Sequence, residues 1–179
     1  SSSYYINNNP ISIICKKNDT ELLKLMIEKG ANRFDTSDLA VACKNLNFEM
    51  IKLLVENGVE MNYTNEGMAL DWENPLGNPL SIVCSNSTIV ECLDGKCGSN
   101  TEFYSKDIFE IIKYLIEKGA DVHANSPLMA AVSLKAGCHE SVSNGNAFYA
   151  DVNIEIIWLL IKKGANVNFC CDDGTSILM

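Results

Sequence analysis

The sequence lacks any apolar run of the roughly 18 residues that a membrane-spanning helix needs. Its opening stretch, SSSYYINNNP, also lacks the basic region and the apolar core of a signal peptide. We therefore expect an intracellular, cytoplasmic protein without a membrane partner, with a nuclear or host-cell location left open.

Basic residues are scarce in this chain. Lys and Arg number 14 against 23 for Asp and Glu, and the formal net charge is -9. A field of this sign opposes the phosphate neutralisation on which nucleic-acid binding depends. The composition thus predicts no nucleic-acid partner.

Residue patterns for catalysis are also missing. The two histidines, His123 and His139, are far apart in the sequence, and no G-x-S-x-G, phosphate-binding loop or H-E-x-x-H occurs. Carboxylates scattered over helix faces are typical of a solvated surface. The sequence predicts no catalytic residue and no cofactor, so we do not expect an enzyme.

What the sequence does contain is one helical phrase that occurs four times. Each copy begins with Glu and ends at a Gly nine residues later, with apolar residues at helical spacing between them. Gly30, Gly58, Gly119 and Gly164 are expected as left-handed C-caps. The copies are ELLKLMIEKGAN (21–32), EMIKLLVENGVE (49–60), EIIKYLIEKGAD (110–121) and EIIWLLIKKGAN (155–166).

A second, shorter element precedes each phrase and reads as a helix start. Its lead residues, Asn9, Ser37, Asn78 and Ser126, can cap free backbone N–H groups. Proline follows in three copies, at the first helical turn where no N–H is required, and Asp38 replaces it in the second copy. Each unit is predicted as a capped helix, a turn and an amphipathic helix that ends at Gly.

These motifs resemble those of the ankyrin-repeat family, from about residue 9 to the C-terminus. The matching features are the Asn/Ser-Pro-Leu helix starts, the E-x-x-x-x-L-I/L-x-K-G-A-D/N phrase, and DDGTSILM at 172–179, which is similar to the start of a further repeat. The resemblance implies an all-α solenoid of stacked helix-turn-helix units with short or irregular hairpin fingers. The family's helix-start histidine is replaced here by Ser12, Ala40, Ser81 and Met129.

We expect one ankyrin-repeat domain over 1–179, belonging to a longer chain. Its helix pairs are predicted at about 9–30, 37–58, 78–119 and 126–164, with a partial repeat at 172–179. The third and fourth pairs contain insertions at about 88–106 and 136–151 that end alike, in EFYSKDIFEII and AFYADVNIEII. These matched endings predict one extra lobe on the side opposite the fingers.

The eight cysteines divide into three groups, of which Cys170 and Cys171 are expected to be ordinary residues of a strand edge on the last hairpin. Cys15, Cys43 and Cys84 share one repeat position and are predicted to be small buried hydrophobes, too far apart for a disulfide. Cys92, Cys97, Cys138 and His139 lie in the insertions, where a thiol clip or a zinc site across the two is an alternative to ordinary surface residues. The C-x-x-C spacing is absent, so no metal site is our principal expectation.

The resemblance implies a non-catalytic module that binds a protein partner through its concave face and fingers, and we expect it to be a monomer. A regulatory or targeting segment of a larger enzyme or of a host-directed effector is the alternative, and a metal or redox site in the insertions is the third. Trp158 replaces a repeated Lys on the second helix, and we expect the neighbouring insertion to cover it. The candidate contact residues are Lys16, Lys17, Lys44, Asn45, Tyr63, Trp72, Ser85, Asn86, His123, Ser133 and Leu134.

Overall fold

The computed structural model describes residues 9–62, 78–86, 101–124, 126–133, 148–169 and 176, and these contain eight helices. They form four successive pairs. The bounds are α1 Pro10–Lys17, α2 Thr20–Glu28, α3 Thr36–Lys44, α4 Phe48–Glu56, α5 Pro79–Asn86, α6 Thr101–Glu117, α7 Pro127–Ser133 and α8 Phe148–Lys162.

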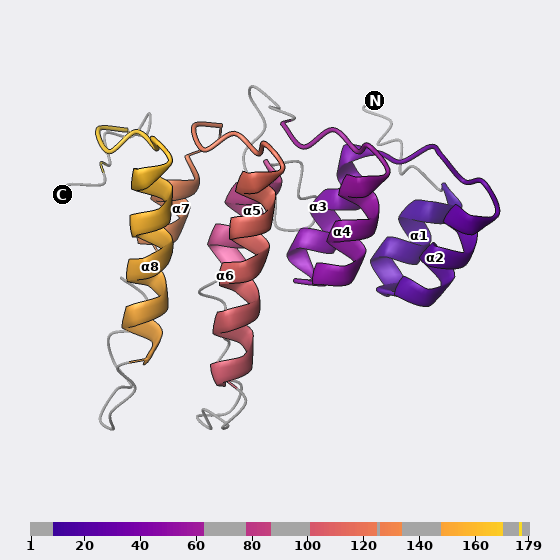
Figure 1. Ribbon diagram of the computed structural model, residues 1–179, viewed down its shortest axis with the longest axis horizontal. Coiled ribbons are helices and arrows are strands. Elements are labelled where there is room, and N and C mark those ends of the chain that lie inside the picture. The colour runs from indigo at the N-terminus through magenta and orange to yellow at the C-terminus, as the bar shows by residue number, and fades with distance from the viewer. Residues whose placement is uncertain are drawn as a thin grey trace, which may run out of the picture.

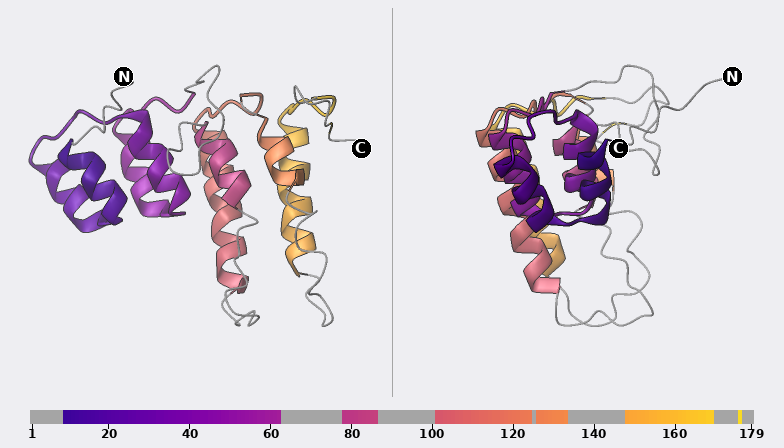
Figure 2. Two further views of the ribbon diagram at one scale, coloured as in Figure 1. Left: turned by 180° about the vertical axis from the view of Figure 1, so that it is seen from behind. Right: turned by 90° about the vertical axis from the view of Figure 1, so that its right-hand side faces the viewer.

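The pairs stack side by side in one line, which gives two parallel rows of helices (Figure 1). The first-helix row contains α1, α3, α5 and α7, and the second-helix row contains α2, α4, α6 and α8; Figure 2 shows the two rows end-on. Successive pairs are joined along one edge of the stack, here called the loop edge (residues 29–36, 57–62, 118–124 and 163–169). The opposite edge contains the short turns within the first two pairs, at 18–19 and 45–47, and is called the turn edge.

The helix starts follow the predicted capping pattern in three of the four first helices. Asn9 accepts a hydrogen bond from the Ile11 N–H, Asn78 from the Leu80 N–H and Ser126 from the Met129 N–H. The prediction for α3 was wrong, because its cap is Asp35 and not Ser37. Asp35 and Asp38 form a capping box, in which the Asp38 carboxylate accepts from the Asp35 N–H, and α3 begins at Thr36, two residues before the predicted start at Asp38.

The four glycines end the second helices as predicted. All four have positive φ, between 83° and 98°, where a residue with a Cβ atom is strained. At Gly30 the N–H donates to the Ile27 carbonyl and the next N–H, from Ala31, donates to the Met26 carbonyl. This pair of bonds is the Schellman arrangement, and it turns the chain into the loop edge at a fixed angle.

A buried hydrogen bond joins the first two first helices. The Ser12 hydroxyl donates to the Asp38 carboxylate at 2.6 Å, and both side chains are buried. The second carboxylate oxygen accepts from the Asp35 N–H, so one side chain both caps α3 and ties it to α1. Ser12 stands where the family has its helix-start histidine, and it supplies an interlayer hydrogen bond at that position.

Cys15, Cys43 and Cys84 are buried in the core, which confirms the prediction that they pack as small apolar residues. Burial disfavours the thiolate and raises the pKa of Cys15 to about 12, with the nearby Asp38 carboxylate as a second cause. Burial also raises the pKa of Cys43 and of Cys84 far above the ordinary thiol range.

Two second helices are much longer than their counterparts. α6 has 17 residues and α8 has 15, against nine for α2 and for α4. Their additional residues extend away from the loop edge, so residues 101–106 and 148–151, which we assigned to the insertions, are helical (Figure 1). The rest of the insertions, and with it the predicted lobe, lies outside the described residues.

Replacing Asp38 tests the interlayer hydrogen bond. Asp38→Ala removes the acceptor of the buried Ser12 hydroxyl and half of the α3 capping box, so we expect a loss of about 3 kcal/mol in the free energy of unfolding, measured with urea. Asp38→Asn keeps a carbonyl acceptor and should lose less. If Asp38→Ala and Asp38→Asn destabilise the protein equally, acceptance of these hydrogen bonds is not what Asp38 contributes.

Alkylation tests the burial of the three thiols. At about pH 9, where an ordinary thiol is largely ionised, iodoacetamide should leave Cys15, Cys43 and Cys84 unmodified in the folded protein, because burial keeps them protonated and covered. Peptide mapping by mass spectrometry reads each site separately. The matched control is the same reaction in urea, where all three should be labelled; equal labelling rates with and without urea would contradict their burial.

Candidate partner-binding surface

The exposed side of the first-helix row is apolar and basic at its α1 and α3 end. Ile13, Lys16 and Lys17 are exposed on α1, and Lys44 is exposed at the end of α3, beside the half-buried Val41. Ile13 was not among the predicted contacts. The sequence pattern indicates that Ile13 is exposed. The other apolar residues of ISIIC, at 11, 14 and 15, share the buried side of the helix and leave Ile13 on the opposite side.

The three lysines also have a local structural role. Lys16 and Lys17 occupy the last turn of α1, and Lys44 the last residue of α3. A cation at a helix C-terminus interacts favourably with the exposed carbonyl groups there. These side chains therefore lie where the exposed side of the first-helix row meets the turn edge.

Two other predicted contact residues, Asn45 and Ser85, form hydrogen bonds with the protein's own backbone. Asn45 is exposed, but its side-chain amide donates to the Cys15 carbonyl at 3.3 Å and joins the ends of α1 and α3. Ser85 is half-buried and its hydroxyl donates to the Ile82 carbonyl of its own helix. Asn86 and Ser133 are the last residues of α5 and α7. Leu134 lies outside the described residues.

His123 lies at the loop edge, so the predicted contact set is divided between two edges of the molecule. The residue is exposed, and its backbone N–H donates to the Asp121 carboxylate at 2.8 Å. The other two predicted finger residues, Tyr63 and Trp72, lie outside the described residues. Of the contact residues predicted at the loop edge, His123 is therefore the one whose position the structure describes.

The loop that contains His123, residues 119–124, is held in place by Asn62 from the preceding loop. The Asn62 amide donates to the Gly119 carbonyl at 3.0 Å and accepts from the Asp121 N–H at 2.8 Å. The amide of Asn78 donates to the Asp121 carbonyl at 3.1 Å, and the Ser81 hydroxyl donates to the Ala124 carbonyl at 3.2 Å. These hydrogen bonds fix residues 119–124 against two other segments, which gives the loop edge a defined shape for recognition.

Trp158 is exposed, with 69% of its surface accessible, so the expectation that an insertion covers it was wrong. Its neighbours one turn away on the same side of α8, Ile154 and Ile161, are exposed as well. Sequence position alone could not decide this, because it depends on which chain segment packs beside α8.

The described part of the chain contains neither a cluster of metal ligands nor a membrane-spanning helix. No group of three or more His, Cys, Asp or Glu side chains there could hold a metal ion. Cys92, Cys97, Cys138, His139, Cys170 and Cys171 lie outside it. No helix within the described ranges has the length and apolar character to cross a membrane.

Comparison with known proteins gives one kind of match. No family model and no curated protein matches the chain. Among solved structures, the ankyrin-repeat domain of human ASB11 is similar: it is 20% identical over 96% of this chain and 90% of that chain, with a TM-score of 0.35. The stacked helix pairs, the polar caps and the left-handed glycines establish the architecture of this chain independently of that match. The fold is that of an ankyrin-repeat solenoid, as the sequence resemblance implied.

Proposed function

We propose that this domain is a non-catalytic module that binds a protein partner along the first-helix row and the loop edge. The observation that carries the proposal is the uneven chemistry of that row. α1 and α3 present Ile13, Lys16, Lys17 and Lys44, whereas α5 and α7 contain no charged residue. A partner segment whose acidic residues meet the ends of α1 and α3 would fit this basic end.

The overall charge of the protein makes this basic end more distinctive. The chain has a formal net charge of -9, so the field around most of the molecule repels an acidic segment. The lysines at the ends of α1 and α3 provide a local exception, and electrostatic complementarity of this kind selects the register of a bound segment. The hydrogen-bonded loop 119–124 then provides a second, rigid contact with His123 at its surface.

Charge removal at the turn edge tests the proposal. The triple variant Lys16→Ala, Lys17→Ala, Lys44→Ala should bind a partner captured from the source cell about tenfold more weakly or worse, because each exposed ion pair contributes up to about 1 kcal/mol. Calorimetric titration at two salt concentrations measures this loss. The triple variant should also show the weaker dependence on salt.

A matched control comes from the second-helix row. Lys113 of α6 and Lys162 of α8 are exposed lysines that belong to neither the first-helix row nor the loop edge. Lys113→Ala, Lys162→Ala should leave the affinity for that partner unchanged. If both sets of lysines change the affinity equally, only net charge matters and the assignment of the first-helix row is wrong.

A further inference from the structure

The end of α4 differs from the other three glycine-ended helices in one residue. The residue before the glycine is Lys29, Lys118 or Lys163 in those units, and it is Asn57 in the second unit. Asn57 and Gly58 are both exposed at the loop edge. An asparagine followed by glycine is especially prone to deamidation, because glycine has no side chain to hinder the attack of its backbone nitrogen on the asparagine amide.

The fold requires the glycine of this pair. Gly58 has a φ of 83°, in the left-handed region, where a residue with a Cβ atom is strained. Its N–H donates to the Val55 carbonyl at 3.1 Å, and the Val59 N–H donates to the Leu54 carbonyl at 3.2 Å. These two bonds end α4 in the Schellman arrangement. The reactive pair is therefore built into the helix end.

The folded helix end keeps the two reacting groups apart. Deamidation closes a five-membered ring, for which the Gly58 nitrogen must reach the Asn57 Cγ atom. Asn57 has a ψ of 15°, which places the Gly58 nitrogen on the side of the Asn57 backbone nitrogen and away from the Asn57 side chain. The side-chain amide also points back along α4, where it donates to the Leu53 carbonyl at 2.7 Å. Ring closure thus requires the end of α4 to unwind.

The product of deamidation would fit this helix end poorly. The Asn57 side chain supplies a donor to the Leu53 carbonyl, and an ionised carboxylate at that place has none. It would face the carbonyl with a negative charge, at the end of the helix where the macrodipole disfavours anions. Glu56 and Glu60, both exposed, carry charge of the same sign close by in the chain. A lysine, as in the other three units, meets none of these penalties.

We propose that Asn57 is a deamidation site that the folded helix end protects and that unfolding exposes. The Gly58 amide loses its proton to hydroxide, its nitrogen bonds to Asn57 Cγ, and the side-chain nitrogen takes up a proton and leaves as ammonia. Water then opens the resulting succinimide at either carbonyl, which gives aspartate or, with an additional carbon in the backbone, isoaspartate. Both products weaken the end of α4, so time spent unfolded makes the loss of structure irreversible.

The affected helix end also leads into an anchor of the loop edge. Gly58 begins the segment that reaches Asn62, whose amide bonds to the backbone of Gly119 and Asp121. An additional backbone carbon at residue 57 shifts the start of this segment. Deamidation therefore loosens loop 119–124 together with α4.

Deamidation rates in the folded and the unfolded protein test the protection. The protein is kept for several days in mildly alkaline buffer with and without guanidinium chloride, and mass spectrometry then measures the conversion of Asn57 from amide to acid. Asn57 should react at least about tenfold more slowly in the folded protein, because reaction requires local opening of α4. Asn144, which also precedes a glycine, should react about as fast as Asn57 in guanidinium chloride and so verifies the conditions. Equal rates for Asn57 in the two solutions overturn the proposal.

Two substitutions test what the modification does to the fold. Asn57→Asp creates one of the two products and should lower the folded-to-unfolded ratio about fivefold in equilibrium denaturation. Asn57→Lys introduces the residue of the other three units and cannot deamidate at this position. After the same incubation in guanidinium chloride and dilution, Asn57→Lys should regain more of its circular dichroism than the unmodified protein. The proposal is overturned if both proteins lose refolding yield at the same rate, or if Asn57→Asp is as stable as the unmodified protein.

Discussion

The constraint on which this structure depends is that no helix pair can bury its own apolar surface. The helices of the first two pairs have eight or nine residues, which is too short to be stable in isolation, so the packing between layers holds them. Leu22 shows this most directly. It occupies the same repeat position as Met50, Ile111 and Ile156, and differs from them in exposure because of its place in the stack. Exposure in this molecule follows from neighbours as much as from residue type.

The glycine turns and the polar bridges convert that packing into a surface of fixed shape. Each second helix ends in a left-handed glycine, which directs the following loop along one edge. Asn62 then bonds to the backbone on both sides of Ala120, and Asn78 bonds to the Asp121 carbonyl one residue further. A loop anchored through its backbone keeps its conformation when its side chains vary. Side-chain substitutions on such an edge can therefore change which partner it binds and leave the fold intact.

Features determined by local chemistry could be predicted from the sequence. The Asn and Ser caps, the glycine ends and the three buried cysteines depend on residue type and on spacing within one unit. The start of α3 could not be predicted in the same way. The Asp38 carboxylate accepts one hydrogen bond from the Asp35 N–H at the start of α3 and another from the Ser12 hydroxyl in a different layer. The length of α6 and the exposure of Trp158 also depend on longer-range structure. Residue type also did not reveal that two of the candidate contact residues, Asn45 and Ser85, donate hydrogen bonds to the protein's own backbone.

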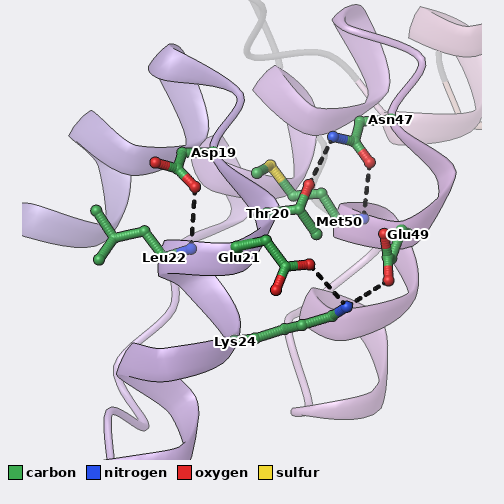
Figure 3. Close-up of polar contacts among 8 residues, drawn as sticks. All are labelled: Asp19, Thr20, Glu21, Leu22, Lys24, Asn47, Glu49 and Met50. Carbon is green, nitrogen blue, oxygen red and sulfur yellow. Dashed lines mark hydrogen bonds and ion pairs between the residues drawn. The ribbon is translucent and has the colours of Figure 1, made fainter.

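The regular frame makes substitutions at equivalent positions informative. A lysine at the Lys24 position can pack its aliphatic stem along a neighbouring helix. Its ammonium group then reaches a carboxylate, as that of Lys24 reaches Glu49 and Glu21 (Figure 3). The hydrogen bonds that the Lys24 ammonium group donates to Glu49 and to Glu21 raise the pKa of Lys24 and so favour its charged form. A tryptophan at the same position cannot form that ion pair, and it leaves a large apolar surface in water unless another surface covers it. Trp158 is 69% exposed within the described chain, so this substitution replaces a charged contact between layers with an apolar surface.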